Sequence, residues 1–312
     1  MRRIIFLFLL SLGVGASFAG AHRGQESGPP EVADGVSVRR DLLFSLPPEG
    51  ALVLDLYRPA ESVGGPWPVV LYIHGGGFKY GSKESIRQYA DQDLPLLGLA
   101  VVSMNYRLSG SAKFPAQLAD VHAALQWIQD SAQAYNLDAG RVALLGYSAG
   151  GTLASLAAVS AGYAVREGQI IPAPMAAPGP DILAVVDYFG PTDVLAGADT
   201  SVRSGGKWSD RDSMISEWFG FPILENPKQV ATANPINYVS ADSPPFLIIH
   251  GDQDKDVPLE QSRRLYAALR KAGADATLHI VKNGDHGRDG DFSTGEHQAL
   301  KREFLLRHLK VE

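Results

Sequence analysis

Continuous apolar runs recur along the chain and predict strands that are buried on both faces of a sheet. Residues 69–74 (VVLYIH) form the first of these runs, directly after Pro66 and Pro68. A short apolar run between turn residues is typical of a strand in a parallel sheet that is covered on both faces. Residues 51–57 (ALVLDLY) alternate instead, which predicts an earlier and partly exposed strand. Further strands are predicted at 99–106, 141–147, 182–190, 245–251 and 276–281.

Apolar residues spaced three or four positions apart lie between these runs and predict helices. Residues 115–128 carry such a spacing, with Pro115 near the start of the predicted helix. A second helix is predicted after Pro258, with Gly273 closing it, and a third covers the residues around 300–305. Because strands and helices alternate, we expect an α/β fold with a mostly parallel central sheet and helices on both faces.

One long segment, residues 191–244, departs from this alternation. It separates two predicted strands and contains several turn signals. It holds the aromatic residues Trp208, Trp218, Phe219 and Phe221. A connection of this length inside a compact domain is usually functional, so we interpret it as a small lid or a binding wall. The alternative is a peripheral helix with a small satellite core.

The composition is that of a globular protein with a sizeable core. The chain has 312 residues, of which 45% are hydrophobic and 20% charged, and its net charge is −6. This length fits one large α/β domain, and the acidic balance without a basic run does not indicate a nucleic-acid partner. Cysteine is absent from the sequence. That excludes disulfides, a thiol nucleophile, thiolate metal ligands and iron–sulfur clusters.

The N-terminal residues predict a secretory signal peptide. Arg2 and Arg3 precede an apolar stretch over residues 4–12, and small residues then lead to the sequence AGA that ends at Ala21. This succession of charged, apolar and A-x-A segments is typical of a signal peptide and predicts cleavage near Ala21. Residues 1–21 are therefore predicted to be removed.

The alternative for this segment is a membrane anchor. A spanning helix needs about 20 consecutive apolar residues, and Gly13 and Gly15 interrupt the run. We therefore expect export to the periplasm or outside the cell, with no stable membrane anchor after cleavage. Residues 22–40, rich in glycine and proline at their start, are predicted to be a flexible lead-in, and 41–312 a single domain.

A glycine-rich loop follows the first buried strand, in the sequence HGGGF from His74 to Phe78. Consecutive glycines free the backbone to turn its N–H groups toward a ligand, as in a site for the negative oxygen of a tetrahedral intermediate. The alternative is a phosphate-binding loop. Tyr80 occupies the last glycine position of the dinucleotide pattern, and no Gly-Lys-Ser/Thr follows, so neither phosphate motif is met.

A second candidate is Ser148, in the sequence GYSAGG that lies between a predicted strand and a predicted helix over 153–161. A serine on a sharp strand-to-helix turn needs small neighbours such as Gly146 and Gly150, because its backbone is strained there. It also lies at a helix N-terminus, where the dipole favours negative charge. In isolation Ser148 could equally be a small residue at a junction.

Three aspartates alternate in the sequence HGDQDKDVP that ends at Pro258. A calcium loop would need glycine and glutamate where this chain has Val257 and Arg263, so we reject a calcium site. One of the aspartates could orient a histidine, and Asp256 is well placed to cap the helix that begins near Pro258.

His286 lies in the sequence KNGDHGRDG after the last predicted strand. On this loop we expect it to be exposed, mobile and suited to general-base chemistry near neutral pH. The remaining histidines have other expected roles: His74 and His250 as structural parts of their turns, His122 within a helix, and His297 and His308 in solvent on the last helix.

The order of these motifs is that of the α/β-hydrolase fold: a glycine loop, then serine, then aspartate, then histidine. The chain resembles serine esterases of this fold, most of all the bifunctional feruloyl/acetyl xylan esterase (BD-FAE-like) family and the hormone-sensitive-lipase-like carboxylesterases. The resemblance covers about residue 50 to the C-terminus. It is carried by HGGGF (74–78), NYRLS (105–109), FPAQLADVHAALQWI (114–128), GYSAGG (146–151), HGDQD (250–254) and DHG (285–287).

The resemblance implies a catalytic domain over 41–312 and a role for each site residue. Ser148 would be the nucleophile and His286 the base, and the pattern His-Gly-x-x-Asp places the orienting acid at Asp254, with Asp256 as the alternative. The oxyanion donors would be the backbone N–H groups of Gly76, Gly77 and Ala149.

Tyr147 differs from the motif of the lipase-like family, which usually has aspartate directly before the serine. This favours the feruloyl/acetyl esterase side of the resemblance.

The function implied is hydrolysis of small acyl esters through an acyl-enzyme, with acetyl or feruloyl esters of plant polysaccharide as candidate substrates. Such chemistry needs neither a metal nor an organic cofactor, and its partner would be a small-molecule or glycan-linked ester. Two alternatives stay open: a serine peptidase or other acyl hydrolase on the same fold, and a non-catalytic binding protein with this fold. The sequence does not define an oligomeric state.

Overall fold

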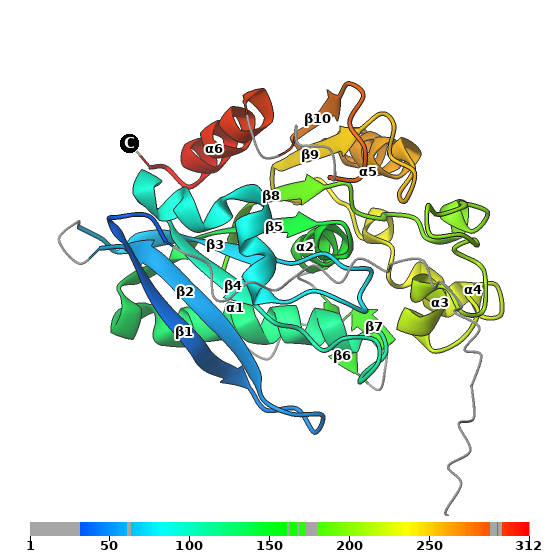
Figure 1. Ribbon diagram of the computed structural model, residues 1–312, viewed down its shortest axis with the longest axis horizontal. Coiled ribbons are helices and arrows are strands. Elements are labelled where there is room, and N and C mark those ends of the chain that lie inside the picture. Colours follow the sequence, from blue (N-terminus) through cyan, green and yellow to red (C-terminus); the bar gives the residue numbers. More distant parts are fainter. Residues whose placement is uncertain are drawn as a thin grey trace, which may run out of the picture.

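The computed structural model describes residues 32–60, 64–160, 180–287, 292 and 295–311, together with the backbone of 163–166 and 169–172. The predicted signal peptide and most of the predicted lead-in lie outside the described residues. Within this part of the chain, the main sheet has eight strands in the order β1-β2-β4-β3-β5-β8-β9-β10 (Figure 1). Their bounds are β1 Val36–Ser45, β2 Leu52–Pro59, β3 Trp67–Ile73, β4 Ala100–Met104, β5 Leu137–Tyr147, β8 Ile182–Tyr188, β9 Phe246–Gly251 and β10 Ala276–Val281.

The sheet is mostly parallel, as the alternation of strands and helices predicts. β1 and β2 form an antiparallel hairpin at one edge, and β2 also pairs antiparallel with β4. From β4 to β10 every neighbouring pair is parallel. The carboxyl ends of β3, β5, β8, β9 and β10 therefore meet at one edge of the sheet, where ligands bind in open α/β sheets.

Two expectations about the first strands are wrong. β1 begins at Val36, so residues 36–40 belong to the sheet and not to a flexible lead-in. β2 was expected to be partly exposed, but all of its residues except Val53 are buried. The reason for both is the same: β1 pairs along β2 and makes it an interior strand of the sheet.

Helices and 3₁₀ turns cover both faces of this sheet. The helices predicted around 115–128, after Pro258 and around 300–305 are present, and Gly273 ends the second of them in a left-handed conformation. Their bounds are α1 Ala116–Tyr135, α2 Ala149–Val159, α5 Leu259–Ala272 and α6 Glu296–His308; the two 3₁₀ helices are η1 Lys83–Tyr89 and η2 Asp91–Leu97.

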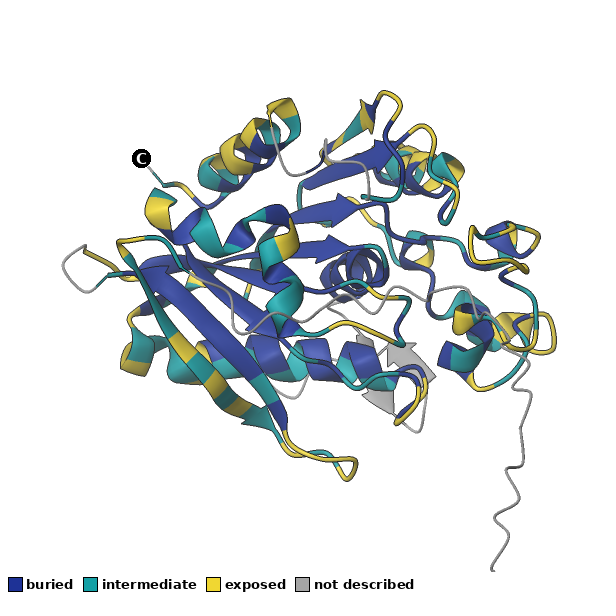
Figure 2. Ribbon diagram, in the orientation of Figure 1, coloured by how far each residue is buried: buried dark blue, intermediate teal, exposed yellow. Residues whose placement is uncertain are grey.

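The alternation of side chains along the strands produces two separate hydrophobic cores. On β3, Val69 and Leu71 face the core that contains α1, α2 and α5, whereas Val70 and Tyr72 face the core that contains η1, η2 and α6. β3, β4 and β9 are buried over their whole length, and β5 and β8 are buried in the part that leads to their carboxyl ends (Figure 2). This is the continuous burial that their uninterrupted apolar runs require.

Residues 191–244 form an irregular segment between β8 and β9, which we call the excursion. It contains the short helices α3 Met214–Phe219 and α4 Pro227–Ala231 and the 3₁₀ turns η3 Leu195–Gly197 and η4 Pro235–Asn237. Its buried side chains, Trp218 and Phe219 among them, belong to the same core as α1 and α2. The excursion is thus packed onto the main domain, and a satellite core is not what holds it.

Two short strands were not predicted from the sequence. β6 Tyr163–Arg166 and β7 Gln169–Pro172 pair antiparallel with each other, apart from the main sheet. Among the described residues, none of the helices combines the length and the apolar character needed to cross a membrane.

Candidate active site

Ser148 lies on the tight turn between β5 and α2. Its φ of 53° and ψ of −119° are unusual for a residue with a side chain. The turn needs glycine on both sides: a Cβ on Gly146 would overlap the carbonyl oxygen of Gly150, and a Cβ on Gly150 would overlap that of Ile73 at the end of β3. The two glycines let the strands and the helix approach closely, and Ser148 is held at the carboxyl edge of the sheet.

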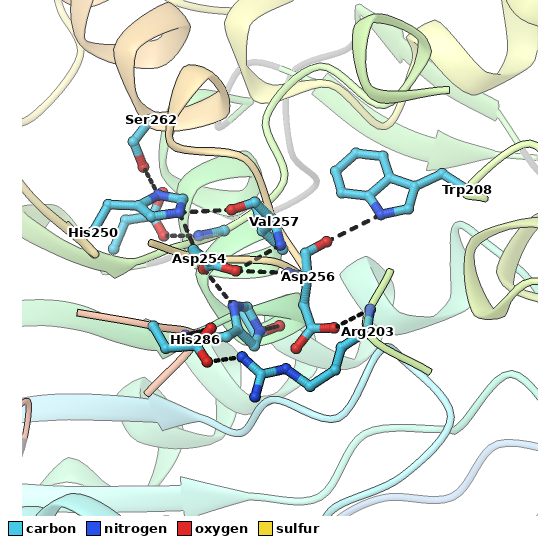
Figure 3. Close-up of polar contacts among 12 residues, drawn as sticks. Arg203, Trp208, His250, Asp254, Asp256, Val257, Ser262 and His286 are labelled. Carbon is cyan, nitrogen blue, oxygen red and sulfur yellow. Dashed lines mark hydrogen bonds and ion pairs between the residues drawn. The ribbon is translucent and has the colours of Figure 1, made fainter. Parts of the chain in front are cut away.

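Ser148, His286 and Asp254 form one hydrogen-bonded chain. The Ser148 Oγ lies 2.8 Å from the His286 Nε2. The His286 Nδ1 lies 2.7 Å from the Asp254 Oδ2 (Figure 3). A carboxylate only accepts hydrogen bonds, so the Nδ1 carries the proton in the neutral ring and the Nε2 is left as an acceptor for the Ser148 hydroxyl. This arrangement is suited to removing the proton from Ser148.

The Asp254 carboxylate receives hydrogen bonds on both oxygens. The Asp256 and Val257 N–H groups each donate to its Oδ1 over 2.8 Å. Its Oδ2 faces His286 and also lies 3.1 Å from the Nε2 of His250. Burial by itself would raise the pKa of Asp254, but the hydrogen bonds from His250 and His286 outweigh it and hold the pKa below its usual value. Asp254 is therefore ionised at neutral pH.

The neighbouring aspartates have other partners. Asp256 was the alternative acid and an expected helix cap, but its Oδ1 accepts a hydrogen bond from the Arg203 N–H, 3.2 Å away. α5 begins after Pro258 without a side-chain cap, so the capping expectation is wrong. The Oδ1 of Asp252 accepts the N–H of Asn283. Of the three, Asp254 is the one that contacts His286.

The glycine loop lies against the turn that carries Ser148. A Cβ on Gly75 would lie 2.9 Å from the Tyr147 carbonyl oxygen and 3.4 Å from the Ser148 Cβ. In the part of the chain that the structure describes, no hydrogen bond uses the N–H groups of Gly76, Gly77 or Ala149. These backbone donors of the glycine loop and of the turn at Ser148 are thus available to a ligand.

The excursion holds this loop by aromatic packing. The Trp218 ring in α3 is fully buried and stacks on the Phe78 ring, with centroids 3.6 Å apart and planes 3° apart. The Trp218 indole N–H donates to the Gln117 Oε1 over 2.9 Å, and Glu217 forms a 2.6 Å ion pair with Lys79. Phe78 and Lys79, the two residues at the end of the glycine loop, are therefore both held by α3.

The excursion also contacts the two loops that carry Asp254 and His286. The Arg203 guanidinium pairs with the carboxylate of Asp285, whose Oδ1 accepts the backbone N–H of His286. The Trp208 indole N–H donates to the Asp256 carbonyl over 3.2 Å. One segment of the chain thus touches the surroundings of all three candidate residues.

His286 was expected to be exposed, but its side chain is only 13% exposed. The Phe189 ring lies 4.6 Å from the imidazole, centroid to centroid, and covers it. Gly287 continues the loop where a Cβ would collide with Tyr89 and Phe189. The imidazole is therefore enclosed by packed rings, and the loop does not present it to open solvent.

The other histidines divide into structural and paired ones. His74 is buried, stacks on Tyr106 and has a pKa lowered to about 4 by burial. Burial also lowers the pKa of His122 in α1. His297 was expected to be in solvent, but it is half-buried and its Nδ1 lies 2.8 Å from the Nε2 of His279 in β10. His308 is half-buried against Phe304.

Tyr147, the residue before the candidate nucleophile, points away from the substrate side. It is buried and stacks on Tyr89, and its hydroxyl donates to the Asp91 Oδ2 over 2.8 Å. The buried Lys301 of α6 pairs with the other oxygen of Asp91. Tyr147 therefore ties the turn at Ser148 to the core beneath it.

Three side chains near the site were not predicted from the sequence to support the candidate catalytic residues: His250, Arg203 and Trp218. For His250, a signal existed in the HGDQD motif, where its position four residues before Asp254 was interpreted only as part of a turn. Arg203 and Trp218 gave only the general signal of a long aromatic segment, because their partners are far away in the sequence. Within the described residues, no group of three or more His, Asp or Glu side chains is placed to hold a metal ion.

The sheet order, the turn at Ser148 and the position of the excursion define an α/β-hydrolase fold. A carbohydrate esterase from gut microbiota, solved in a truncated form, has this architecture: it superimposes with a TM-score of 0.76 at 28% identity, over 91% of this chain and 99% of that one. The family model BD-FAE matches residues 54–269. The chain belongs to the BD-FAE family, as the sequence motifs predict.

Curated relatives carry names of the same kind. Esterase LipQ of Mycobacterium tuberculosis is 31% identical over 76% of this chain and 54% of its own length. An acetylxylan esterase of Xylanibacter ruminicola is 30% identical over 78% of this chain and 45% of its own length. The chain spans about half the length of the curated relatives it matches.

Proposed function

We propose that the protein is a serine carboxylic-ester hydrolase. The observation that carries this proposal is the 2.8 Å contact between the Ser148 Oγ and the His286 Nε2, with Asp254 on the far side of the same imidazole. Membership of the BD-FAE family and the esterase names of its relatives support the same chemistry.

In the first half of the reaction, Ser148 attacks the carbonyl carbon of the ester. The His286 Nε2 takes the hydroxyl proton as the new C–O bond forms, and the ionised Asp254 stabilises the imidazolium. The negative oxygen of the tetrahedral intermediate faces the N–H groups of Gly76, Gly77 and Ala149. His286 then gives its proton to the leaving alcohol, and the acyl group stays on Ser148.

In the second half, water replaces the alcohol. His286 takes a proton from the water as its oxygen attacks the acyl carbon, and returns a proton to the Ser148 oxygen when the ester bond to the enzyme breaks. The products are a carboxylic acid and the free enzyme. Each step uses only side chains and backbone groups of this chain.

We further propose small acyl esters of plant polysaccharide, acetyl or feruloyl, as the substrate class. The support is the names of two similar proteins, an acetylxylan esterase and a carbohydrate esterase. Export to the periplasm or the outside of the cell is part of this proposal and rests on residues 1–21 alone. N-terminal sequencing of the protein from a native host tests the cleavage near Ala21.

The activity is tested with p-nitrophenyl acetate and butyrate on the wild type and on Ser148→Ala. We expect turnover by the wild type and loss of nearly all of it in the variant, with Ser240→Ala, an exposed serine before β9, as the matched control. A fluorophosphonate probe should label the wild type and not Ser148→Ala. Absence of wild-type turnover and labelling would favour the non-catalytic alternative, and hydrolysis of peptide substrates alone would favour the peptidase alternative.

A further inference from the structure

A hollow of about 460 Å³ lies beside the glycine loop, separate from the Ser148–His286–Asp254 chain. Its walls come from the turn between β1 and β2, from the end of the glycine loop, from the segment after β4 and from α3. Because β2 runs antiparallel to β4, the turn before β2 and the end of β4 lie at the same edge of the sheet as Ser148. The hollow therefore lies at the same edge of the sheet as Ser148, at the far end of the glycine loop.

Four charged side chains line this hollow, and each has a partner of opposite charge. Lys79 pairs with Glu217 over 2.6 Å, and Arg107 pairs with Glu49 over 3.0 Å and, behind the lining, with Asp120 over 2.7 Å. Both cations of the lining are therefore already neutralised, which does not favour a phosphate or a carboxylate as the ligand. Ser111 adds a hydroxyl to the wall. Ala51, Leu52 and Leu108 add apolar surface to the same wall. A lining that combines paired charges, a hydroxyl group and apolar surface suits a neutral ligand that has both hydroxyl groups and C–H faces.

Tyr80 supplies an aromatic surface to the same hollow. Its side chain is 59% exposed, unlike the neighbouring Phe78, which is fully buried. The carbonyl oxygen of Gly76 accepts the N–H groups of Lys79 and Tyr80, so a single tight turn separates Tyr80 from the backbone donors of the glycine loop. An exposed aromatic face with polar neighbours can pack on the C–H face of a sugar ring while the hydroxyls bond to the polar groups.

We propose that this hollow binds a sugar unit of the alcohol part of the substrate, so that the enzyme acts on acyl groups carried by a neutral oligosaccharide or polysaccharide chain. The inference rests on the proposed ester hydrolysis, since the sugar would be held while its acyl group lies at Ser148. In this proposal the glycine loop has a second role: the residues that follow it, Lys79 and Tyr80, contact the alcohol part of the ester.

Binding is tested apart from catalysis by titrating unacetylated xylohexaose into the Ser148→Ala protein and following it by calorimetry or NMR. We expect saturable binding that Tyr80→Ala, made in the same background, weakens about five- to tenfold and that Tyr80→Phe largely keeps. Leu224→Ala is the control, because Leu224 is a comparably exposed residue (61%) that does not line the hollow. Equal binding in Tyr80→Ala, or equal loss in Leu224→Ala, would overturn the proposal.

The same variants are then compared in turnover. We expect Tyr80→Ala to lower the ratio of kcat/KM for acetylated xylo-oligosaccharide to that for p-nitrophenyl acetate. If the ratio for p-nitrophenyl octanoate falls instead, the hollow holds an acyl chain and the sugar assignment is wrong. If xylohexaose binds at Tyr80 but no ester is hydrolysed, the ester-hydrolase function fails while the sugar site stands.

A second and independent inference concerns His250. Its imidazole is fully buried, and its Nε2 faces two acceptors, the Val257 carbonyl oxygen at 2.9 Å and the Asp254 Oδ2 at 3.1 Å. Both acceptors lack a proton at neutral pH, so the Nε2 carries the hydrogen, and the Nδ1 accepts from the Ser262 hydroxyl 2.6 Å away. Ser262, in α5, thereby fixes the ring orientation of His250.

We infer that His250 is a positioning residue for the reaction. It donates to the same oxygen of Asp254 that receives the Nδ1–H of His286, and therefore fixes the direction of that oxygen toward the imidazole. The Asp254 Oδ1 is held by the Asp256 and Val257 N–H groups, so His250 completes the constraint on the carboxylate. Without it, the oxygen facing His286 would lose one of its two imidazole donors.

The test is the turnover of His250→Phe and His250→Gln, normalised to active sites counted by fluorophosphonate labelling. We expect His250→Phe to lower kcat about 10- to 100-fold with little change in KM, the rate equivalent of one hydrogen bond to a charged group. His250→Gln, which keeps a donor, should restore part of the rate, and the low-field proton resonance of the His286 Nδ1–H should shift in the Phe variant. An unchanged kcat per active site with a lower Tm would show that His250 only supports folding and would overturn the inference.

Discussion

The two sides of Ser148 are held by different kinds of interaction. On the glycine-loop side, the buried contact is the stacking of Phe78 on Trp218, with the partly exposed Lys79–Glu217 ion pair beside it. On the other side, Asp254 and the Asp285–His286 loop are held by hydrogen bonds and ion pairs, including those from Arg203. The excursion takes part in both.

Because of this difference, the two sides should respond differently to substitutions, to pH and to salt. Packing is sensitive to the volume and shape of a side chain and hardly to pH or salt. A hydrogen-bonded carboxylate is sensitive to charge, so an isosteric amide suffices to disturb it. The predictions below separate the two sides by these criteria.

The largest effect is expected from Asp254→Asn, a change of charge without a change of volume. An amide in this place cannot accept from both sides as the carboxylate does, and it does not stabilise the imidazolium of His286. We expect kcat to fall about 10³- to 10⁴-fold, as when a triad acid is replaced elsewhere. Steady-state kinetics check this, with Asp256→Asn as the control that should stay within about threefold, since its carboxylate faces Arg203. Similar losses in both variants would contradict the assignment.

On the packed side, Trp218→Ala should lower the free energy of unfolding by about 3–5 kcal/mol, the usual cost of removing a buried aromatic ring. It should also lower kcat, because Phe78 and the adjoining glycine loop lose the ring that they pack on. Trp218→Phe keeps a stacked ring and should keep most of the stability and most of kcat. It loses the hydrogen bond to Gln117, which should cost a small part of the stability.

Urea unfolding and kinetics measure these effects of Trp218. Trp127→Ala, a half-buried tryptophan in α1, is the matched control and should lower stability without lowering kcat. A Trp218→Ala protein with the kcat of the wild type would mean that the stacking does not position the loop.

A smaller effect is expected at Asp187, a second buried carboxyl group, whose surroundings contrast with those of Asp254. Burial raises its pKa to about 6, and its partners are neutral donors, the Gly190 N–H and the Ser155 hydroxyl. The folded state therefore binds this proton more tightly than the unfolded state, and the wild type loses stability as the pH rises from about 4 to 6. Asp187→Asn removes this loss.

The stability of Asp187→Asn relative to the wild type should rise by about 2 kcal/mol between pH 4.5 and pH 7.5. Urea unfolding at the two pH values measures this difference. Trp218→Phe is the comparison from the packed side, and its stability relative to the wild type should not depend on pH over this range. A pH-independent difference for Asp187→Asn would show that the carboxyl group titrates as in the unfolded chain.

The smallest effect is expected from Arg203→Met, which removes the ion pair with Asp285. The Arg203 side chain is 38% exposed, so solvent and salt weaken the pair, and we expect a loss of stability of about 1 kcal/mol or less. Thermal unfolding at low and high salt should show the wild type approaching the variant as salt is added. A salt-independent difference would assign the role of Arg203 to its packing.

The sequence was sufficient for the parts of the fold that depend on local pattern. Apolar runs such as 69–74 predict strands, because a strand that is covered on both faces consists almost entirely of apolar residues. β1 was missed because it contains Arg39, Arg40 and Asp41 and pairs only at the edge of the sheet, where no apolar run is required. The 3₁₀ helices η1 and η2 were missed because their apolar residues do not follow the α-helical spacing.

For the site, the sequence identified residues on short motifs but not those that meet through the fold. Ser148, Asp254 and His286 each stand in a recognisable motif, and the structure brings them together. The contact of Trp218 with Phe78 joins positions 140 apart in the chain, and no local pattern specifies it. The contact of His250 with Asp254 is local, yet it depends on how the loop after β9 folds back.

The excursion leaves the sheet after β8 and returns to it at β9, which lies directly beside β8. The excursion therefore begins and ends on neighbouring strands. Its length and sequence can change without a change in the order of the strands in the sheet. A change in this one segment would then alter the support of both loops at once, because α3 packs on the glycine loop and Arg203 reaches the histidine loop. Sequence changes confined to residues 191–244 would thus reach both sides of the site while the turn at Ser148 stays unchanged.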